Sequence, residues 1–106
     1  MTMVNLTPHA VTFLVDGKDP IVVPASGTVA RLKTSTAVIG DVDGIPITKT
    51  VFGDITDLPD PVDGVVYIVS SLVAQACKDR SDVFIPNDSV RNAEGQIIGC
   101  RSLGRI

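Results

Sequence analysis

The dipeptide Asp43-Gly44 constrains the fold of this chain more than any other feature of its sequence. It separates two runs rich in β-branched residues, 38–42 and 45–51. A two-residue turn of type I′ needs positive φ at both central positions, which Asp and Gly adopt readily. The sequence therefore predicts a β-hairpin here. Pro46 cannot donate a backbone hydrogen bond, which places the second strand at a sheet edge or a bulge.

Short strands separated by turns are predicted along most of the remaining chain. Their ranges are residues 11–15, 21–23, 28–33, 65–69, 83–85, 89–91 and 96–100. Val, Ile and Thr are abundant while aromatic residues make up only 4% of the chain, so a sheet is favoured over a helical bundle. We predict a single compact β-rich domain over residues 1–106, an antiparallel sandwich or partly open barrel with one short helix near residues 71–78.

The stretch YIVSSLVAQACKDR, residues 67–80, joins a buried strand to the predicted helix. Residues 65–69 are five apolar residues in a row, which is typical of a central strand covered on both faces. Ser70 or Ser71 is expected to cap the helix, and Lys78 to lie in its last turn at the negative end of the helix dipole. The unpaired N–H groups of a helix start attract anions, but ordinary N-capping is the commoner role of such serines.

The net charge of −3 argues against binding to a nucleic-acid polymer, because such domains usually carry a basic excess. Between positions 41 and 63 there are six aspartates and a single base, Lys49. The bases of the carboxyl-terminal part are Lys78, Arg80, Arg91, Arg101 and Arg105. This uneven distribution allows a local cationic patch, and solvated loop charge is the alternative of equal weight.

The sequence contains no pattern typical of a metal site, a signal peptide or a membrane span. A structural zinc site takes about four ligands, and the chain has one His and two widely separated cysteines, Cys77 and Cys100. The amino terminus lacks the basic start and the apolar run of a signal peptide, and no apolar run approaches the roughly 18 residues of a membrane span. We therefore expect no metal, no cofactor and no membrane partner, and a cytoplasmic location with reduced thiols.

Candidate binding residues come from three parts of the chain: the amino terminus, the predicted helix start and the scattered arginines. A lone His can contact a ligand or act as a base, but more often it only completes a turn. Guanidinium groups bind phosphate oxygens in pairs, although each arginine alone is more simply a surface residue or an ion-pair partner of a nearby acid. The predicted ligand-binding residues are Asn5, Thr7, His9, Arg31, Ser70, Ser71, Arg80, Asp82, Arg91 and Arg101. No glycine-rich phosphate loop and no catalytic residue are predicted.

Five segments of the chain resemble a family of small proteins carried by tailed phages and prophages. They are NLTPH (5–9), PASGTVAR (24–31), YIVSSLVAQA (67–76), RSDVFIP (80–86) and GCRSL (99–103). The resemblance extends over nearly the whole chain and implies a phage setting, but it implies no reaction. By analogy, phages also encode compact homo-oligomeric proteins that sequester the nucleotide signals of bacterial immunity.

The resulting hypothesis is a non-enzymatic homo-oligomer in the cytoplasm of an infected bacterium. It would sequester an ADP-ribose derivative or a cyclic nucleotide and so block anti-phage defence. Arg80, Arg91 and Arg101 are expected to converge on the phosphates beside the Ser70-Ser71 helix start. Two alternatives stay open: a structural, virion or protein-binding phage component that docks through the acidic segment 54–63, and a small nucleotide phosphodiesterase that uses His9 with Asp82.

Overall fold

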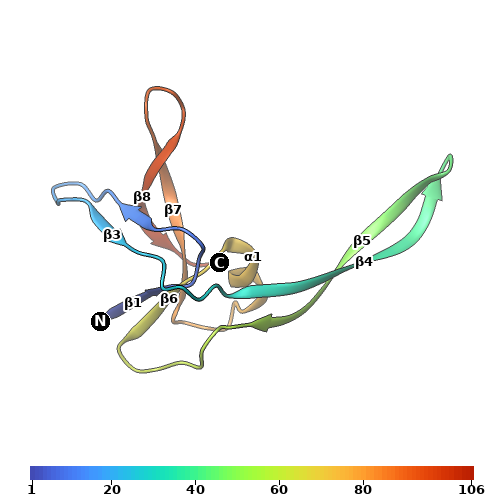
Figure 1. Cartoon of the computed structure of the whole chain (residues 1–106), viewed down its shortest axis with the longest axis horizontal. Helices are drawn as coiled ribbons and strands as arrows, with labels where there is room; N and C mark the ends of the chain where they lie inside the picture. Colours follow the sequence, from blue (N-terminus) through green and yellow to red (C-terminus); the bar gives the residue numbers. More distant parts are fainter.

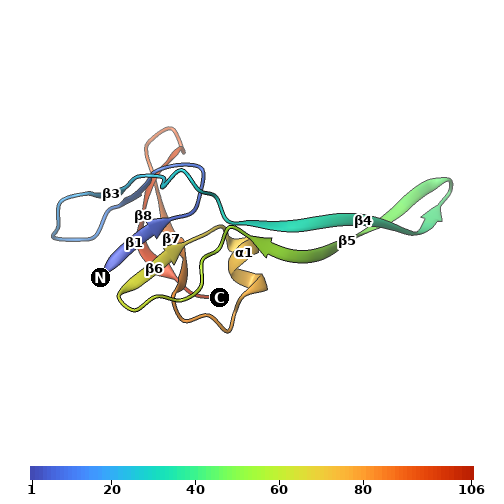
Figure 2. The ribbon, with the colours of Figure 1, turned by 60° about the horizontal axis from the view of Figure 1, so that its bottom comes forward.

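The computed structural model describes all 106 residues, which form a body and a long protruding arm (Figure 1). The strands are β1 (Thr2–Asn5), β2 (Val11–Phe13), β3 (Ile21–Val23), β4 (Arg31–Val42), β5 (Ile45–Thr56), β6 (Val65–Ile68), β7 (Val83–Arg91) and β8 (Ile97–Gly104), and the one helix is α1 (Ser71–Ala76). The arm is β4, its turn and β5, residues 31–56. The body is the rest of the chain, and both termini lie in it (Figures 1 and 2).

The body is a six-stranded sheet that curls into a nearly closed barrel. Its strand order is β1-β6-β7-β8-β2-β3. An isolated bridge between Asn5 and Ala25 brings its two edges together. With 53% of residues in strands and 6% in helix, the prediction of a β-rich, partly open barrel with one short helix is confirmed.

The pairing within this sheet is mixed, where the sequence led us to expect antiparallel neighbours. β6 lies parallel to both β1 and β7, and β2 meets β8 in parallel at one position. Parallel neighbours need a crossover connection, and α1 with the turn after it supplies one between β6 and β7. The pairs β2–β3, β4–β5 and β7–β8 are antiparallel as predicted.

Two element boundaries differ from the prediction. The helix ends at Ala76 with Cys77 as its C-cap, so Lys78 lies beyond the last turn instead of in it. The strand expected to end before Pro86 continues to Arg91. Pro86 lies opposite Leu103 in this ladder, so the lack of an N–H group at one position did not interrupt the strand.

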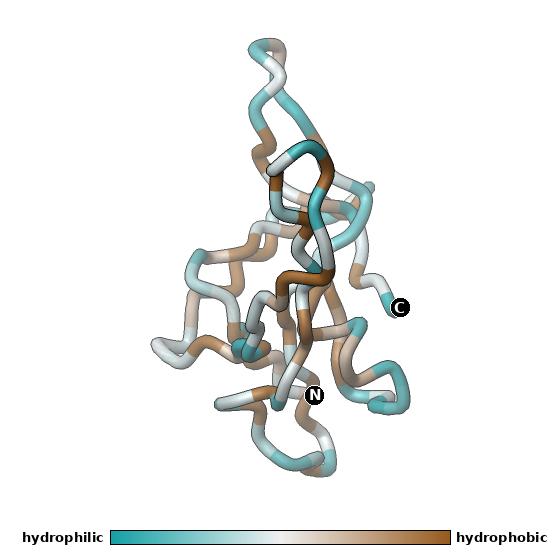
Figure 3. The backbone as a smooth tube through the Cα atoms, turned by 90° about the vertical axis from the view of Figure 1, so that its right-hand side faces the viewer, coloured by the Kyte–Doolittle hydropathy of each residue, from teal (hydrophilic) through white to brown (hydrophobic).

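The core of the body has two parts, which lie on opposite faces of the sheet at β6. Tyr67, Val69 and Val73 belong to a cluster between the sheet and α1, and Ile68 packs with Phe13 in the other. Ile68 and Val69 have no exposed surface, which confirms the central strand predicted at residues 65–69. In Figure 3 hydrophilic residues (teal) form much of the outer turns.

The arm confirms the predicted hairpin and extends it. Asp43 and Gly44 have φ angles of 50° and 81°, as a type I′ turn requires. Both strands are 12 residues long, well above the usual five to six. The arm stretches the molecule to 56 × 39 × 23 Å. We call residues 31–33 and 54–56 the root of the arm. Every residue of the arm between them is exposed.

The six-residue α1 is the only helix of the structure, and no helix here has the length and apolarity that crossing a bilayer demands.

Candidate functional site

A hollow of about 250 Å³ lies where β1, β6 and the arm root meet, and we call it the root hollow. β1 and β6 are parallel neighbours with Asn5 opposite Ile68. Because parallel strands end on the same side of a sheet, the residues two positions further, Thr7 and Ser70, both reach this hollow. Arg31, the first residue of β4, also lines it. The structure thus brings together three of the predicted binding residues.

Apolar side chains form most of the wall of the root hollow. They are Leu6, Pro8, Val29, Ala30, Leu32, Leu72 and Val73. The backbone ties the two sides of the wall together, since the Ala30 N–H donates to the carbonyl oxygen of Leu6 at 3.0 Å. Leu6, Ala30 and Val73 are themselves buried residues of the core cluster between the sheet and α1, so the hollow lies directly on that cluster.

Asn5 holds Thr7 in place and is itself only 1% exposed. Its amide nitrogen donates to the carbonyl oxygens of His9 at 2.8 Å and Val23 at 3.1 Å. Its Oδ1 accepts from the Thr7 N–H at 2.9 Å and from the Thr7 hydroxyl at 2.6 Å. Asn5 therefore positions the segment that carries Thr7, and its own polar groups are all engaged.

His9 contributes its backbone to this network. Its carbonyl oxygen accepts from Asn5 and lies 2.9 Å from the Thr7 hydroxyl oxygen. Its side chain is exposed and lines none of the hollows of the structure. His9 and Asp82 do not share a hollow, so no base and acid pair is assembled from them.

The Arg31 guanidinium has no acidic partner. The structure contains one ion pair, and it joins Arg80 to Asp82. Arg31 takes part in the hydrogen bonds of the structure through its backbone carbonyl, which accepts from the Thr56 hydroxyl at 3.4 Å. Its side chain makes no hydrogen bond within the chain, so its five N–H donors are free to bind an anion.

Ser70 acts mainly as the N-cap of α1. Its Oγ accepts from the Val73 N–H at 3.4 Å, and its carbonyl oxygen accepts from the Ala74 N–H at 3.0 Å. The prediction that a serine caps the helix is thus confirmed for Ser70. A helix of six residues has a weak dipole, so the attraction of its first turn for anions adds little. Ser71 is the first helical residue and does not line the root hollow.

The expected convergence of Arg80, Arg91 and Arg101 does not occur within the chain. Arg80 lines a different hollow near the start of β6, together with Asp82. Arg101 lines an apolar groove with Phe13 on the other part of the sheet. Arg91 donates to the Gly95 carbonyl oxygen at 2.7 Å within its own hairpin.

Arg80 is held by Asp82 and by a backbone carbonyl oxygen. Its Nε and Nη2 atoms donate to the two carboxylate oxygens of Asp82, each at 2.8 Å, and Nη2 also donates to the Pro59 carbonyl oxygen at 3.0 Å. These side-chain hydrogen bonds lower the pKa of Asp82 and raise the pKa of Arg80. The pair fastens the loop before β6 to the turn after α1.

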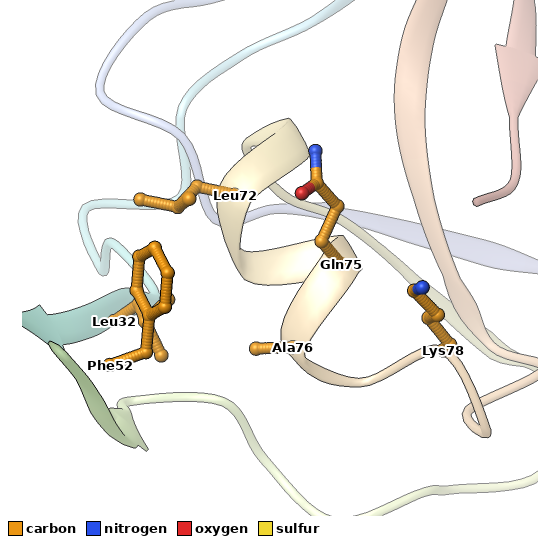
Figure 4. A pocket seen from close by; sticks show the side chains of 6 residues that line it. All are labelled: Leu32, Phe52, Leu72, Gln75, Ala76 and Lys78. Atoms are coloured by element: carbon orange, nitrogen blue, oxygen red, sulfur yellow. The ribbon is translucent and has the colours of Figure 1, made fainter. Parts of the chain in front are cut away.

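A second hollow of about 240 Å³ lies beside the first, between α1 and the arm, and we call it the helix hollow. Figure 4 shows Leu32 and Phe52 of the arm facing Leu72 and Ala76 of α1, with Lys78 at the far end of the helix. Leu32 and Leu72 line both hollows, so the two are adjacent. This site is not predictable from the sequence, because no local pattern relates Phe52 to Lys78.

The two cysteines are free and buried, in separate parts of the core. Burial raises the pKa of both thiols. No group of three or more His, Cys, Asp or Glu side chains is placed to hold a metal ion. The arm root thus combines one unpaired cation, Arg31, and the hydroxyl-bearing residues Thr7 and Ser70 with an apolar wall.

No protein-family model matches the chain, and comparison with curated proteins and with solved structures finds no match either.

Proposed function

We propose that the protein binds a small phosphate-bearing ligand of nucleotide type at the arm root and does not alter it chemically. One observation carries this proposal. The unpaired Arg31 guanidinium lies at a hollow that Thr7 and Ser70 also line, against an otherwise apolar wall. The guanidinium group and the Ser70 hydroxyl, whose hydrogen has no protein partner, can donate to phosphate oxygens, whereas the Thr7 hydroxyl already donates to Asn5. The apolar wall is suited to the face of a base.

The adjacent helix hollow supports a ligand larger than inorganic phosphate. Typical ligand pockets measure about 300–1,000 Å³, and each of the two hollows alone falls below that range. Together they offer a nucleotide-sized surface with a cation at each end, Arg31 in one hollow and Lys78 in the other. A ligand with two separated anionic or polar groups fits this arrangement.

The resemblance to small phage proteins supports sequestration as the biological role. A protein that binds a nucleotide immune signal without turnover lowers its free concentration and so protects the phage from host defence. In this role the protein acts as a homo-oligomer in the cytoplasm of the infected cell.

A structural or protein-binding phage component is the second candidate. The observation that favours it is the exposed arm with its many uncovered apolar side chains, because such surfaces mark sites of protein association.

Isothermal titration calorimetry tests the proposal with ADP-ribose, cyclic ADP-ribose, cyclic dinucleotides and inorganic phosphate as probes. We expect binding of at least one nucleotide. Arg31→Ala should weaken it by about 1.5–3 kcal/mol, the value of a hydrogen bond to a charged group. Lys33→Ala is the matched control, since Lys33 lies two positions along the same strand and lines neither hollow.

Two results would contradict the proposal: no heat with any of these probes, or equal binding by Arg31→Ala and the native chain. Chromatography of the ligand recovered from the complex should show it unchanged, and a hydrolysed product would indicate the phosphodiesterase alternative instead.

A further inference from the structure

The arm is an isolated two-stranded hairpin with no cover of its own. Its contacts with the body gather at the root, where α1 packs against β4. A hairpin of two strands is at best marginally stable in water, and a third strand or a packed face is normally needed. We therefore expect another surface to cover one face of the arm.

The ladder register sorts the arm side chains onto two different faces, because paired residues in an antiparallel ladder point to the same side. One face carries the pairs Ser35–Val51, Ala37–Lys49, Gly40–Ile47 and Val42–Ile45; the other carries Thr34–Phe52, Thr36–Thr50, Val38–Thr48 and Asp41–Pro46. We call the first the aliphatic face, since it holds four large β-branched apolar residues, and the second the threonine face. The residues Val42, Ile45, Ile47 and Val51 are between 40% and 68% exposed.

The chain exposes more surface than a compact monomer of its mass, and the excess is large enough for a stable interface. A compact monomer of 11.1 kDa is expected to expose about 5,600 Å², whereas this chain exposes 7126 Å². The excess is roughly 1,500 Å², and a standard protein interface buries about 800 Å² on each partner. The radius of gyration of 17.0 Å is likewise larger than the roughly 13 Å of a compact chain of this length.

Charge is distributed along the arm in a self-complementary way. The root carries Arg31, Lys33 and Asp54, a net charge of +1, and the tip carries Asp41 and Asp43, a net charge of −2. Two arms laid antiparallel bring Asp43, in the turn of each arm, toward the basic root of the other. Asp41 lies on the threonine face and points away from the partner. A parallel arrangement would instead set like charges beside one another, which is unfavourable.

We propose that the aliphatic face of the arm packs against the same face of a second copy of this chain, with the two arms antiparallel about a two-fold axis. Such an interface is isologous, so each aliphatic residue is covered by the same patch of the partner. Lys49 is the one charged residue among the eight residues that define the aliphatic face. It lies on β5, an open edge of the two-stranded sheet, where its ammonium group reaches water while its stem packs.

The pairing rests on the arm alone and assumes no ligand, so it can hold or fail independently of the nucleotide proposal. Sedimentation velocity over a dilution series tests it with the full chain. We expect a dimer or a larger even assembly for the native chain. Ile47→Lys should weaken the association about tenfold or more, since a buried unpaired charge costs more than the 1.4 kcal/mol of one such factor.

Thr48→Lys is the matched control, because it adds the same charge at the next residue on the threonine face. It should leave the association unchanged. Three results would overturn the pairing: a monomeric native chain, equal dissociation by the two variants, or no effect of Ile47→Lys. A native chain that is monomeric but floats with phosphatidylcholine–phosphatidylglycerol vesicles would assign the face to a membrane surface instead.

A crosslinking experiment provides a second readout that does not depend on destabilisation. Ala37 and Thr36 are consecutive residues in the middle of β4, on the aliphatic and threonine faces respectively. With a short bismaleimide, Ala37→Cys should give a covalent dimer and Thr36→Cys should not. Cys77 and Cys100 are buried, so the native chain provides a low background. Equal crosslinking of the two variants would contradict the proposed face.

Discussion

Strand β6 in the body and the strands of the arm have similar amino acids but opposite surroundings. β6 reads VVYI and lies between β1 and β7, so its last two residues are buried. Val, Ile and Thr also make up half of the arm strands, yet β4 and β5 pair only with each other and stay exposed. A β-branched run therefore predicts a strand, and its neighbours in space decide whether its faces are covered.

The body and the arm also differ in what stabilises them: the body by burial within one chain, the arm by contact with a second copy. Core residues of the body lose contact with water on folding of a single chain, and each contributes about 0.8 kcal/mol per buried methylene. Residues of the arm gain little until a second copy covers them. Substitutions of the same chemistry in the two regions should thus have very different effects.

The largest expected difference is between Val69→Ala in the body and Val38→Ala in the arm. Val69 has no exposed surface, so its truncation should lower the free energy of unfolding by about 3 kcal/mol through lost burial and a cavity. Val38 is 71% exposed on the threonine face, and its truncation should change stability by less than about 0.5 kcal/mol. Urea unfolding followed by circular dichroism measures both, and similar losses would refute the comparison.

A smaller effect is expected from Asn5→Ala, which removes the polar anchor of the body. The substitution leaves the buried carbonyl oxygen of Val23 and the Thr7 N–H without their partners. We expect a loss of about 2 kcal/mol, because buried groups without hydrogen bonds cost about 1–3 kcal/mol each. Asn87→Ala is the control, since Asn87 is exposed and its side chain makes no hydrogen bond. Thermal unfolding of the two variants should separate them clearly; equal melting temperatures would count against the anchoring role.

The smallest effect, and a pH-dependent one, is expected at the Arg80–Asp82 pair. The pKa of Asp82 is lowered in the folded protein. Its contribution is therefore fully present above the ordinary aspartate pKa of about 4 and is lost as the pH falls from there through the lower folded value. Asp82→Asn should cost about 1 kcal/mol at neutral pH, as expected for a partly exposed pair.

This cost should disappear in acid, so the unfolding free energies of Asp82→Asn and the native chain should approach each other below pH 4 or so. Asp54→Asn in the arm is the comparison, because Asp54 is exposed and has no cationic partner. It should have no measurable effect at any pH. A constant difference for Asp82→Asn over the whole range would show that the ion pair contributes nothing through charge.

Part of the candidate site could be predicted because its signals are local. The sequence predicts Thr7 and Ser70 as ligand-binding residues, Ser70 because it lies between an apolar run and a helical pattern. Arg31, in the predicted strand 28–33, is among the predicted ligand-binding residues. Their meeting at one hollow was not predictable, since it depends on β1 lying parallel to β6 in a fixed register. The prediction that Arg80, Arg91 and Arg101 converge was wrong for the same reason: nothing local determines which strand ends are neighbours.

The sequence by itself determined the elements whose causes lie within a few residues. The positive φ angles of Asp43 and Gly44 set the hairpin, and the hydroxyl of Ser70 sets the start of α1. Only the tertiary structure decided the parallel crossover, the pairing of Arg80 with Asp82, and the isolation of the arm from the body. Backbone preferences and caps act over a single turn, whereas burial and charge depend on contacts between segments that lie far apart along the chain.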